Sequence, residues 1–196
     1  MTSRALKIAT ALLLASVLGM GAYLFTLRRS ERERAQNVPD SRPISAPVAG
    51  TPEPVTFYVA DDSAGVLKKQ EVSIALPAPP AMRARELLHV LLGEYVTRPS
   101  HHELAPGADV KDVFLVNGDT AVVDTTTAFA DGHPSGVLVE TLTIASMVKT
   151  LAANIPSVTR VKILVDGKER ETLAGHADLE SFYDVPTLQQ LVDQLQ

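Results

Sequence analysis

The sequence predicts an α+β fold, in which two helices lie on one face of a mixed β-sheet as a two-layer sandwich, preceded by an N-terminal transmembrane helix. Two observations predict it. Residues 8–27 contain no charged residue, and beyond residue 54 the periodicity indicates strand, strand, helix, hairpin, helix and strand in that order. Such an order is typical of a sheet covered by helices. The chain has 196 residues, 45% of them hydrophobic, which is enough for one domain of ordinary size.

The first element is the apolar run IATALLLASVLGMGAYLFTL at residues 8–27. Its length matches the roughly 20 residues that cross a hydrocarbon core of about 30 Å. The basic residues Arg4 and Lys7 before it also fit a cleaved signal peptide. Tyr23 and the following Arg28-Arg29 pair favour an uncleaved anchor, because aromatic and basic residues flank membrane helices.

Residues 28–54 are first basic and then rich in proline, which predicts an extended, semi-rigid stalk. About 25 such residues reach up to about 75 Å at about 3.1 Å per residue. The Lys and Arg residues flanking the membrane helix favour a cytoplasmic C-terminal domain, since cytoplasmic flanks carry the excess. Long domains can cross the membrane despite such flanks, so this count leaves the orientation open.

The part of the chain from Val55 onward is acidic, with 11 Lys and Arg against 19 Asp and Glu, a balance of −8, whereas the whole chain carries −5. This balance argues against nucleic-acid binding, which needs a basic surface. The sequence has no cysteine, so it offers no disulfide, thiol nucleophile or thiolate metal site. It also lacks a glycine-rich phosphate loop, a His-Glu-x-x-His motif and a Gly-x-Ser-x-Gly motif.

The first half of the domain predicts two strands and a helix. Residues 55–61 (VTFYVAD) have β-branched and aromatic content, and residues 71–76 (EVSIAL) alternate apolar and polar positions. Residues 81–93 carry leucines at helical spacing, and Gly93 is expected to cap the helix C-terminus.

The second half predicts a hairpin, a long helix and a strand. The Asn117-Gly118 pair joins two alternating runs between Val110 and Phe129, as in a tight hairpin. Residues 135–156 predict a helix that Ser135 caps and Pro156 ends, and so apolar a helix must be covered by the sheet or by a partner. A last strand carries Val161, Ile163 and Val165 and is followed by the turn Asp166-Gly167.

The segment after the last strand contains His176 and Asp178, a pair that could act as an acid–base dyad. No nucleophile or metal site accompanies the pair, so we interpret the segment as turns at a sheet edge. Leu179, Phe182 and Tyr183 are expected to dock it.

Three other sites contain histidine. His101-His102-Glu103 has ligand-type side chains, but adjacent loop residues rarely converge on one ion, so this segment is predicted to be a solvated loop rather than a metal site. His133 follows a turn and could be a general base, although turn chemistry explains it. His89 is expected at the edge of the core. No catalytic, cofactor-binding or metal-ligating residue is therefore predicted.

Four stretches together resemble a GerMN domain, a module of sporulation and spore-germination proteins. They are LLHVLLG, LAPGADVKDVFLVNGDTAVVDTTTAF, VKTL in the long helix, and PSVTRVKILVDGKERETLAGHADL. The likeness covers about residues 55–183, and its motif residues are Asp124, Glu140, Thr150, Asp166-Gly167 and Gly175-His176. The resemblance implies a bacterial envelope protein whose fold is similar to ring-building modules, with no known catalytic triad or cofactor. One copy is present where two are expected in the family's namesake, and a helix stands in place of a lipidated cysteine, so the fold carries over more directly than a sporulation role.

These expectations divide the chain into a tail (1–7), a transmembrane helix (8–27), a stalk (28–54), a GerMN-like domain (55–183) and a helical C-terminal tail (184–196). The predicted function is a single-pass module of the bacterial cytoplasmic membrane. It is expected to bind envelope proteins or a second copy outside the cytoplasm, without catalysis or cofactor, in sporulation, germination or cell-wall processes. Two alternatives stay open: a cell-wall or polysaccharide enzyme using Asp124, His133 or His176, and a small-ligand or peptide sensor with a concave apolar pocket.

Overall fold

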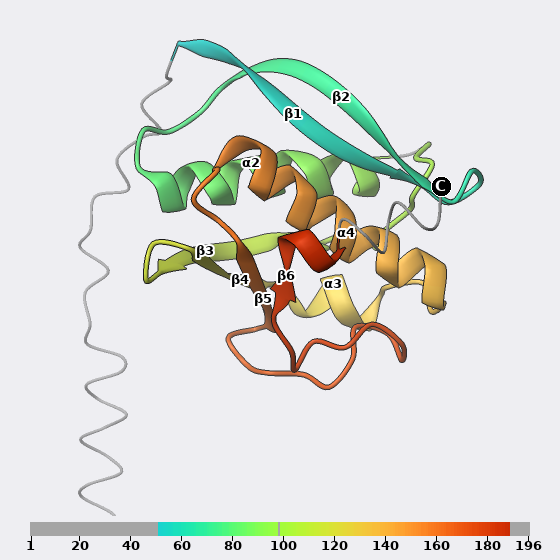
Figure 1. The fold of residues 1–196 in the computed structure, drawn as a ribbon. Coiled ribbons are helices and arrows are strands. Elements are labelled where there is room, and N and C mark those ends of the chain that lie inside the picture. The colour runs from blue at the N-terminus through green and yellow to red at the C-terminus, as the bar shows by residue number, and fades with distance from the viewer. Residues whose placement is uncertain (1–50, 98, 189–196) are drawn as a thin grey trace, which may run out of the picture. The chain divides into compact units, whose positions relative to one another are not determined.

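The computed structural model describes residues 51–97 and 99–188, which are coloured in Figure 1. These residues belong to one compact unit, Pro47–Gln196. The predicted tail, the predicted membrane helix and nearly all of the predicted stalk lie outside the described residues.

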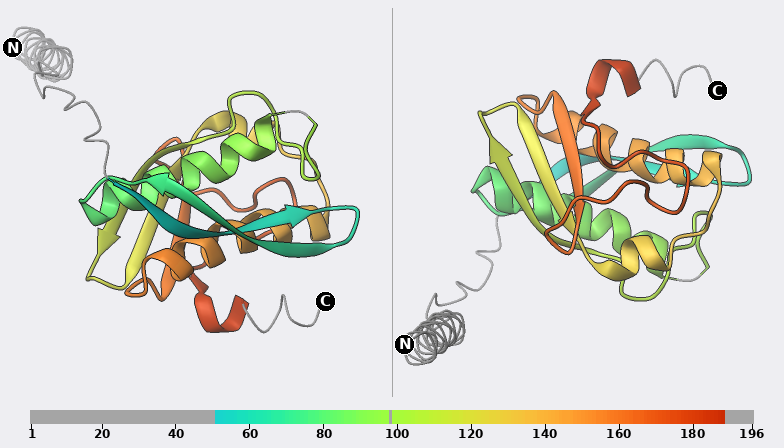
Figure 2. Two further views of the ribbon diagram at one scale, coloured as in Figure 1. Left: turned by 90° about the horizontal axis from the view of Figure 1, so that it is seen from above. Right: turned by 90° about the horizontal axis from the view of Figure 1, so that it is seen from below.

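A hairpin, two long helices and a sheet form three layers (Figures 1 and 2). The hairpin and helices are β1 (Pro52–Asp61), β2 (Val66–Ala75), α2 (Pro80–Val96) and α4 (Val137–Asn154). The sheet contains β3 (Val110–Val116), β4 (Thr120–Thr125), β5 (Arg160–Val165) and β6 (Tyr183–Asp184), in that order, and the short helix α3 (Thr127–Asp131) follows β4. Antiparallel, parallel and antiparallel pairings make the sheet mixed.

The predicted α+β class and the mixed sheet with helices on one face are confirmed, but the two-layer arrangement is wrong. β1 and β2 pair only with each other among the described strands, and they cover the helices on the side opposite the sheet. The outer edge of β1 is instead closed by side chains from α4. Asn154 accepts from the Thr56 N–H at 3.0 Å and donates to the Thr56 carbonyl at 2.7 Å, and the Thr150 hydroxyl accepts from the Tyr58 N–H at 3.0 Å.

Helix α2 supplies a further contact on this edge of β1, to Ala60. The fully buried Tyr95 hydroxyl accepts from the Ala60 N–H at 2.9 Å. Tyr95 lies beyond Gly93, so α2 continues one turn past the glycine that was predicted to cap it. Burial of the Tyr95 ring offsets the roughly 1 kcal/mol that a glycine costs inside a helix.

Four further element boundaries differ from the sequence prediction. β2 begins at Val66, five residues before the strand predicted at 71–76. β1 begins at Pro52, inside the predicted stalk. Pro54 is tolerated in this strand because its missing N–H would point away from β2, at the outer edge of the hairpin. Residues 127–131 form a helix rather than the end of a strand, because the Thr126 side chain accepts from the Phe129 N–H. At the start of α4 the capping position is Gly136, and Ser135 does not cap the helix.

The Asn117-Gly118 hairpin is confirmed, with left-handed φ values of 55° and 84°. Strand β5 and the Asp166-Gly167 turn are confirmed as well. The expected docking of the following segment is also found: Leu179 is buried, and Tyr183 in β6 pairs with Val161 of β5. Residues 185–188 begin the predicted helical tail, and residues 189–196 lie outside the described part.

Helix α4 is the centre of the core, as its apolar sequence predicts. Leu142, Ala145, Met147, Val148 and Leu151 are all buried. It is also the one helix among the described residues that is long and apolar enough to cross a membrane. Its burial between hairpin and sheet explains that composition without a membrane.

Candidate functional site

The carboxylate of Glu140, in the first turn of α4, is fully buried and accepts five hydrogen bonds. One comes from the N–H of Gly136 at the start of its own helix, at 3.0 Å. The other four come from the segment after β5. They are the backbone N–H groups of Ala174, His176 and Ala177 at 2.9 to 3.0 Å, and the His176 ring nitrogen Nδ1 at 2.8 Å.

Two effects oppose each other at this carboxyl. Burial raises the pKa of Glu140, but the hydrogen bonds from Ala177, His176, Gly136 and Ala174 outweigh it and lower the pKa to about 2. The position at a helix N-terminus also favours the negative charge. Glu140 therefore remains ionised in the interior and fixes a loop that has little regular structure of its own.

The other motif residues of the resemblance are contact points of the same kind. Asp124 accepts from the Gly167 N–H at 2.6 Å and so holds the turn after β5. Thr150 holds Tyr58 of the hairpin. Gly175 adopts a φ of 117°, which L side chains rarely adopt, where the chain bends toward Glu140.

His176 and Asp178 do not form the dyad that their spacing allows. The His176 ring contacts Glu140, whereas the Asp178 carboxylate accepts from the backbone N–H groups of Glu180 and Ser181. The three residues of the enzymatic alternative, Asp124, His133 and His176, also have separate partners. Within the described residues no hydrogen bond or ion pair joins any two of them.

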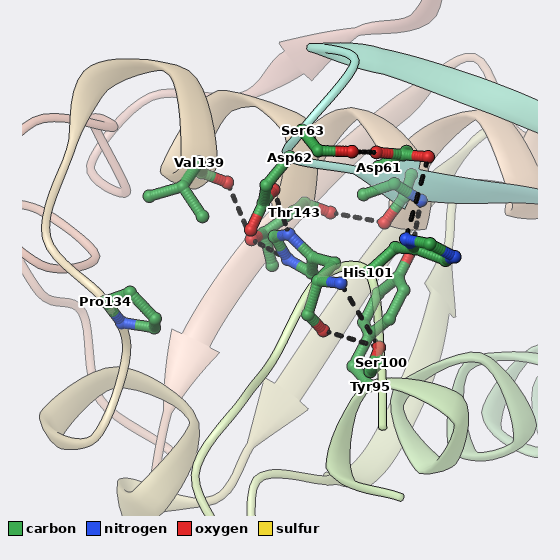
Figure 3. A network of polar contacts seen from close by, with 12 residues as sticks. Asp61, Asp62, Ser63, Tyr95, Ser100, His101, Pro134, Val139 and Thr143 are labelled. Carbon is green, nitrogen blue, oxygen red and sulfur yellow. Dashed lines mark hydrogen bonds and ion pairs between the residues drawn. The ribbon is translucent and has the colours of Figure 1, made fainter. Parts of the chain in front are cut away.

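A second polar cluster lies at the end of the hairpin, centred on the buried hydroxyl of Thr143 (Figure 3). His102 Nε2 lies 2.8 Å and His133 Nε2 2.7 Å from this oxygen. On its other side the His102 ring contacts Asp62 at 2.7 Å, and the His133 ring contacts the Pro134 carbonyl at 2.7 Å. The cluster thus connects the turn between β1 and β2, the loop before β3, the loop before α4, and α4 itself.

The Thr143 hydroxyl has one proton and lies between two imidazole nitrogens. His133 Nδ1 must donate to a carbonyl and His102 Nδ1 to a carboxylate. If both rings were neutral, both Nε2 atoms would be acceptors, and the single Thr143 proton could serve only one of them. The Thr143 hydroxyl can therefore donate to only one of the two rings at a time.

Burial makes protonation of His133 unfavourable. It lowers the pKa of His133, and the nearby His102 lowers it further, against an opposing effect of the Pro134 carbonyl. If both rings were protonated, the Thr143 hydroxyl would have to donate to the Val139 carbonyl, 2.9 Å away. The Thr143 hydroxyl therefore has three neighbouring partners, the two imidazoles and the Val139 carbonyl.

The order Asp62, His102, Thr143 has the residue types of a carboxylate–imidazole–hydroxyl triad. Its position is unsuited to catalysis, because the hydroxyl and the His102 ring have no exposed surface and the hydroxyl lies between two imidazole nitrogens. The predicted solvated loop at 101–103 is therefore wrong for His102, although the His101 side chain is exposed. Asp62 and Thr143 were missed because they lie about 40 residues from His102, with no local signal.

A histidine–aspartate pair lies at the surface, apart from the two clusters. His89 Nδ1 contacts both carboxylate oxygens of Asp109, at 2.9 and 2.8 Å, beside a shallow groove of about 370 Å³. The expected position of His89 at the edge of the core fits its half-exposed ring. Among the described residues no group of three or more His, Asp or Glu side chains is placed to hold a metal ion.

The fold and the two buried clusters define an α+β domain in which polar side chains of α4 fasten distant segments. The chain matches the Germane family, described as sporulation and spore germination, over residues 56–171, and it belongs to that family. It is a GerMN-domain protein, as the sequence resemblance predicted.

One solved structure of GerMN domains supports the same fold, and two further structures are similar at lower TM-scores. The tandem GerMN domains of the Bacillus subtilis sporulation protein GerM are 17% identical, with a TM-score of 0.50 over 67% of this chain and 45% of that one, so this chain spans less than half of the tandem protein. The first GerMN domain of GerM is 18% identical, with a TM-score of 0.45 over 66% and 94%. A candidate lipoprotein from Clostridium perfringens is 18% identical, with a TM-score of 0.42 over 72% and 92%. No curated protein matches the chain.

Glu140→Gln is expected to lower the free energy of unfolding by about 3 kcal/mol at pH 7, because an amide cannot accept from all five donors. Since the folded pKa of Glu140 is lowered to about 2 from an ordinary value of 4.5, its contribution is complete above about pH 4.5 and is lost as the pH falls toward 2. Urea unfolding at pH 7 and pH 3 measures both effects. Glu180→Gln, an exposed carboxylate nearby, is the control, and equal losses in the two variants would contradict the assigned role.

Thr143→Val is expected to cost about 2 to 3 kcal/mol, because it leaves two buried imidazole nitrogens without a partner. Thr143→Ser keeps the hydroxyl and should lose about 1 kcal/mol for the missing methyl group. Urea unfolding measures the difference, and NMR of the imidazole nitrogens should show changed His102 and His133 signals only in the valine variant. Similar stability and unchanged imidazole signals in both variants would be evidence against the cluster.

Proposed function

We propose that this chain is a membrane-anchored protein whose envelope-facing domain binds other proteins and performs no catalysis. The observation that carries this proposal is the use of the acid–base side chains. Glu140, His176, His102 and His133 each hold loops in place, and Asp124 holds a turn. Among the described residues no buried side-chain nitrogen or oxygen lacks a hydrogen-bond partner.

The exposed surface supports protein binding. Phe114 and Val116 lie on the outer face of the sheet, 52% and 42% exposed, and Phe114 is in register with Val122 of β4. Phe182 covers the neighbouring part of that face by stacking on Arg160, at 4.4 Å from the guanidinium carbon to the ring centre. Large apolar side chains left open on a sheet face are typical of interaction surfaces.

The proposed organisation keeps the predicted membrane helix at residues 8–27 and a stalk that now ends before Pro52. A stalk of roughly 25 proline-rich residues holds a domain away from the bilayer, which suits a partner in the cell-wall space. The family description supports a role in sporulation, spore germination or a related cell-wall process. An extracytoplasmic position of the domain agrees with this role. The Lys and Arg residues that flank the predicted membrane helix favour the opposite orientation.

The direct test of protein binding is photo-cross-linking of the full chain in the producing cells. A photoreactive amino acid at Phe114 is expected to give one discrete adduct with a protein that mass spectrometry identifies reproducibly. The same amino acid at Lys168, in the exposed turn after β5, is the control and should give little of that adduct. Identical adduct patterns at both positions, or none at Phe114, would remove the support for an interaction surface.

The orientation can be measured cleanly because the sequence has no cysteine. Ala78→Cys, on an exposed bend of the domain, should react with a membrane-impermeant maleimide in intact cells. Ser3→Cys, in the predicted N-terminal tail, should react only after the cells are opened. The reverse labelling pattern would place the domain in the cytoplasm, as the positive-inside rule favours.

A further inference from the structure

The hairpin has one closed edge and one open edge. The N–H groups of Thr56, Tyr58 and Ala60 point away from β2 and are bound by side chains of α4 and α2. Because facing and outward residues alternate along an antiparallel pair, the register of β1 with β2 makes alternate residues of β2 point outward. These are Leu67, Lys69, Glu71 and Ser73. No strand in the described part of the chain pairs with that side of β2.

Two charges on the open edge make it complementary to itself. Lys69 and Glu71 form an ion pair at 2.8 Å, and their side chains are 56% and 68% exposed. In an antiparallel pairing of two β2 strands about a twofold axis at Gln70, Lys69 of each copy lies opposite Glu71 of the other. Opposite charges in directly facing positions stabilise a strand pair.

The same charges disfavour the neighbouring registers. Outward residues can face only outward residues, so the register changes in steps that keep this match. A shift of two residues in one direction moves the twofold axis to Lys69, so that Lys69 of one copy faces Lys69 of the other. The same shift in the opposite direction moves the axis to Glu71, so that the two Glu71 residues face each other. Each places like charges on the twofold axis, which is destabilising. The charge pattern therefore selects the register centred on Gln70.

An apolar groove beside the open edge supplies further contact area. It lies between β2 and α2, has a volume of about 140 Å³ and is lined by Phe57, Val59, Val72, Val90 and Leu91, with Gln70 and Glu94. Val72 and Val90 are 43% and 37% exposed. In the register centred on Gln70, Lys68 of the second copy lies opposite Val72. Its hydrocarbon stem can cover the valine, while its ammonium group remains with Asp61 of its own hairpin.

We propose that two copies of this chain associate through antiparallel pairing of their β2 edges, which gives a continuous four-stranded sheet in the order β1-β2-β2-β1. The proposal rests on the proposed function as an anchored interaction module and names the second copy as a partner. Edge pairing buries less surface than the roughly 1,200 Å² of a standard interface. Anchoring both copies in one membrane compensates for this, because it raises their effective concentration.

Disulfide trapping tests the predicted register in the full chain, in the membranes of the producing cells. In this register Gln70 faces its own counterpart in a pair without mutual hydrogen bonds, where Cα atoms are about 4.5 Å apart. Gln70→Cys should therefore give a covalent dimer on mild oxidation that a reductant reverses. Val72→Cys, on the same face, is the control. Its two copies would be about 13 Å apart, which is beyond the reach of a disulfide.

Charge exchange tests the selection of that register. Lys69→Glu should weaken the dimer about tenfold, and the double variant K69E/E71K should restore it, because the opposite charges again face each other. Light scattering of the detergent-solubilised full chain over a concentration series measures the dimer. A wild-type monomer at all concentrations without Gln70→Cys dimers would overturn the proposal, as would equal behaviour of the single and double variants. Cross-linking from Phe114 is independent of β2, so its persistence in that case would leave the proposed function intact.

Discussion

The buried carboxylate of Glu140 holds the segment between β5 and β6 in place. The segment between β5 and β6 has a single isolated bridge between Thr172 and Asp178 as its internal pairing, so most of its N–H groups need partners from elsewhere. The two carboxylate oxygens of Glu140 accept from three of these backbone N–H groups, from the His176 ring and from the N–H at the start of its own helix. An ionised side chain is suited to this task because charge-assisted hydrogen bonds are stronger than neutral ones. The cost of burying the charge is met by the number of donors.

The same device recurs along α4. Thr143 joins two loops, Thr150 and Asn154 hold the hairpin, and Glu140 holds the loop after β5. The polar side chains of this otherwise apolar helix thus form hydrogen bonds with the segments that pack around it. This explains why a helix apolar enough for a membrane contains a buried glutamate and two buried threonines.

The sequence predicts the elements well because each depends on local periodicity. The spacing of leucines locates α2, Asn117-Gly118 locates the β3–β4 turn, and the valines of β5 locate the last long strand. What depends on residues far apart in the chain was not predictable. Nothing near His102 indicates that Asp62 and Thr143 surround it, and nothing near Thr56 indicates that Asn154 closes the strand edge. The resemblance identified Glu140 and Thr150 as motif residues, but only the structure shows what each one holds.

The way the hairpin is attached has a consequence for the order of folding. β1 and β2 pair with each other locally. The side chains that close the outer edge of β1 include Thr150 and Asn154, 92 and 98 residues away from the groups they bind, and Tyr95, 35 residues away from Ala60. Contacts between such distant residues form late, since a large loop must close first. During synthesis the hairpin emerges long before α4 exists, and until then the outer edge of β1 lacks the partners that α4 supplies to Thr56 and Tyr58. The strand edge that α4 eventually closes is therefore the part of the nascent chain most exposed to mispairing, and completion of α4 ends that period.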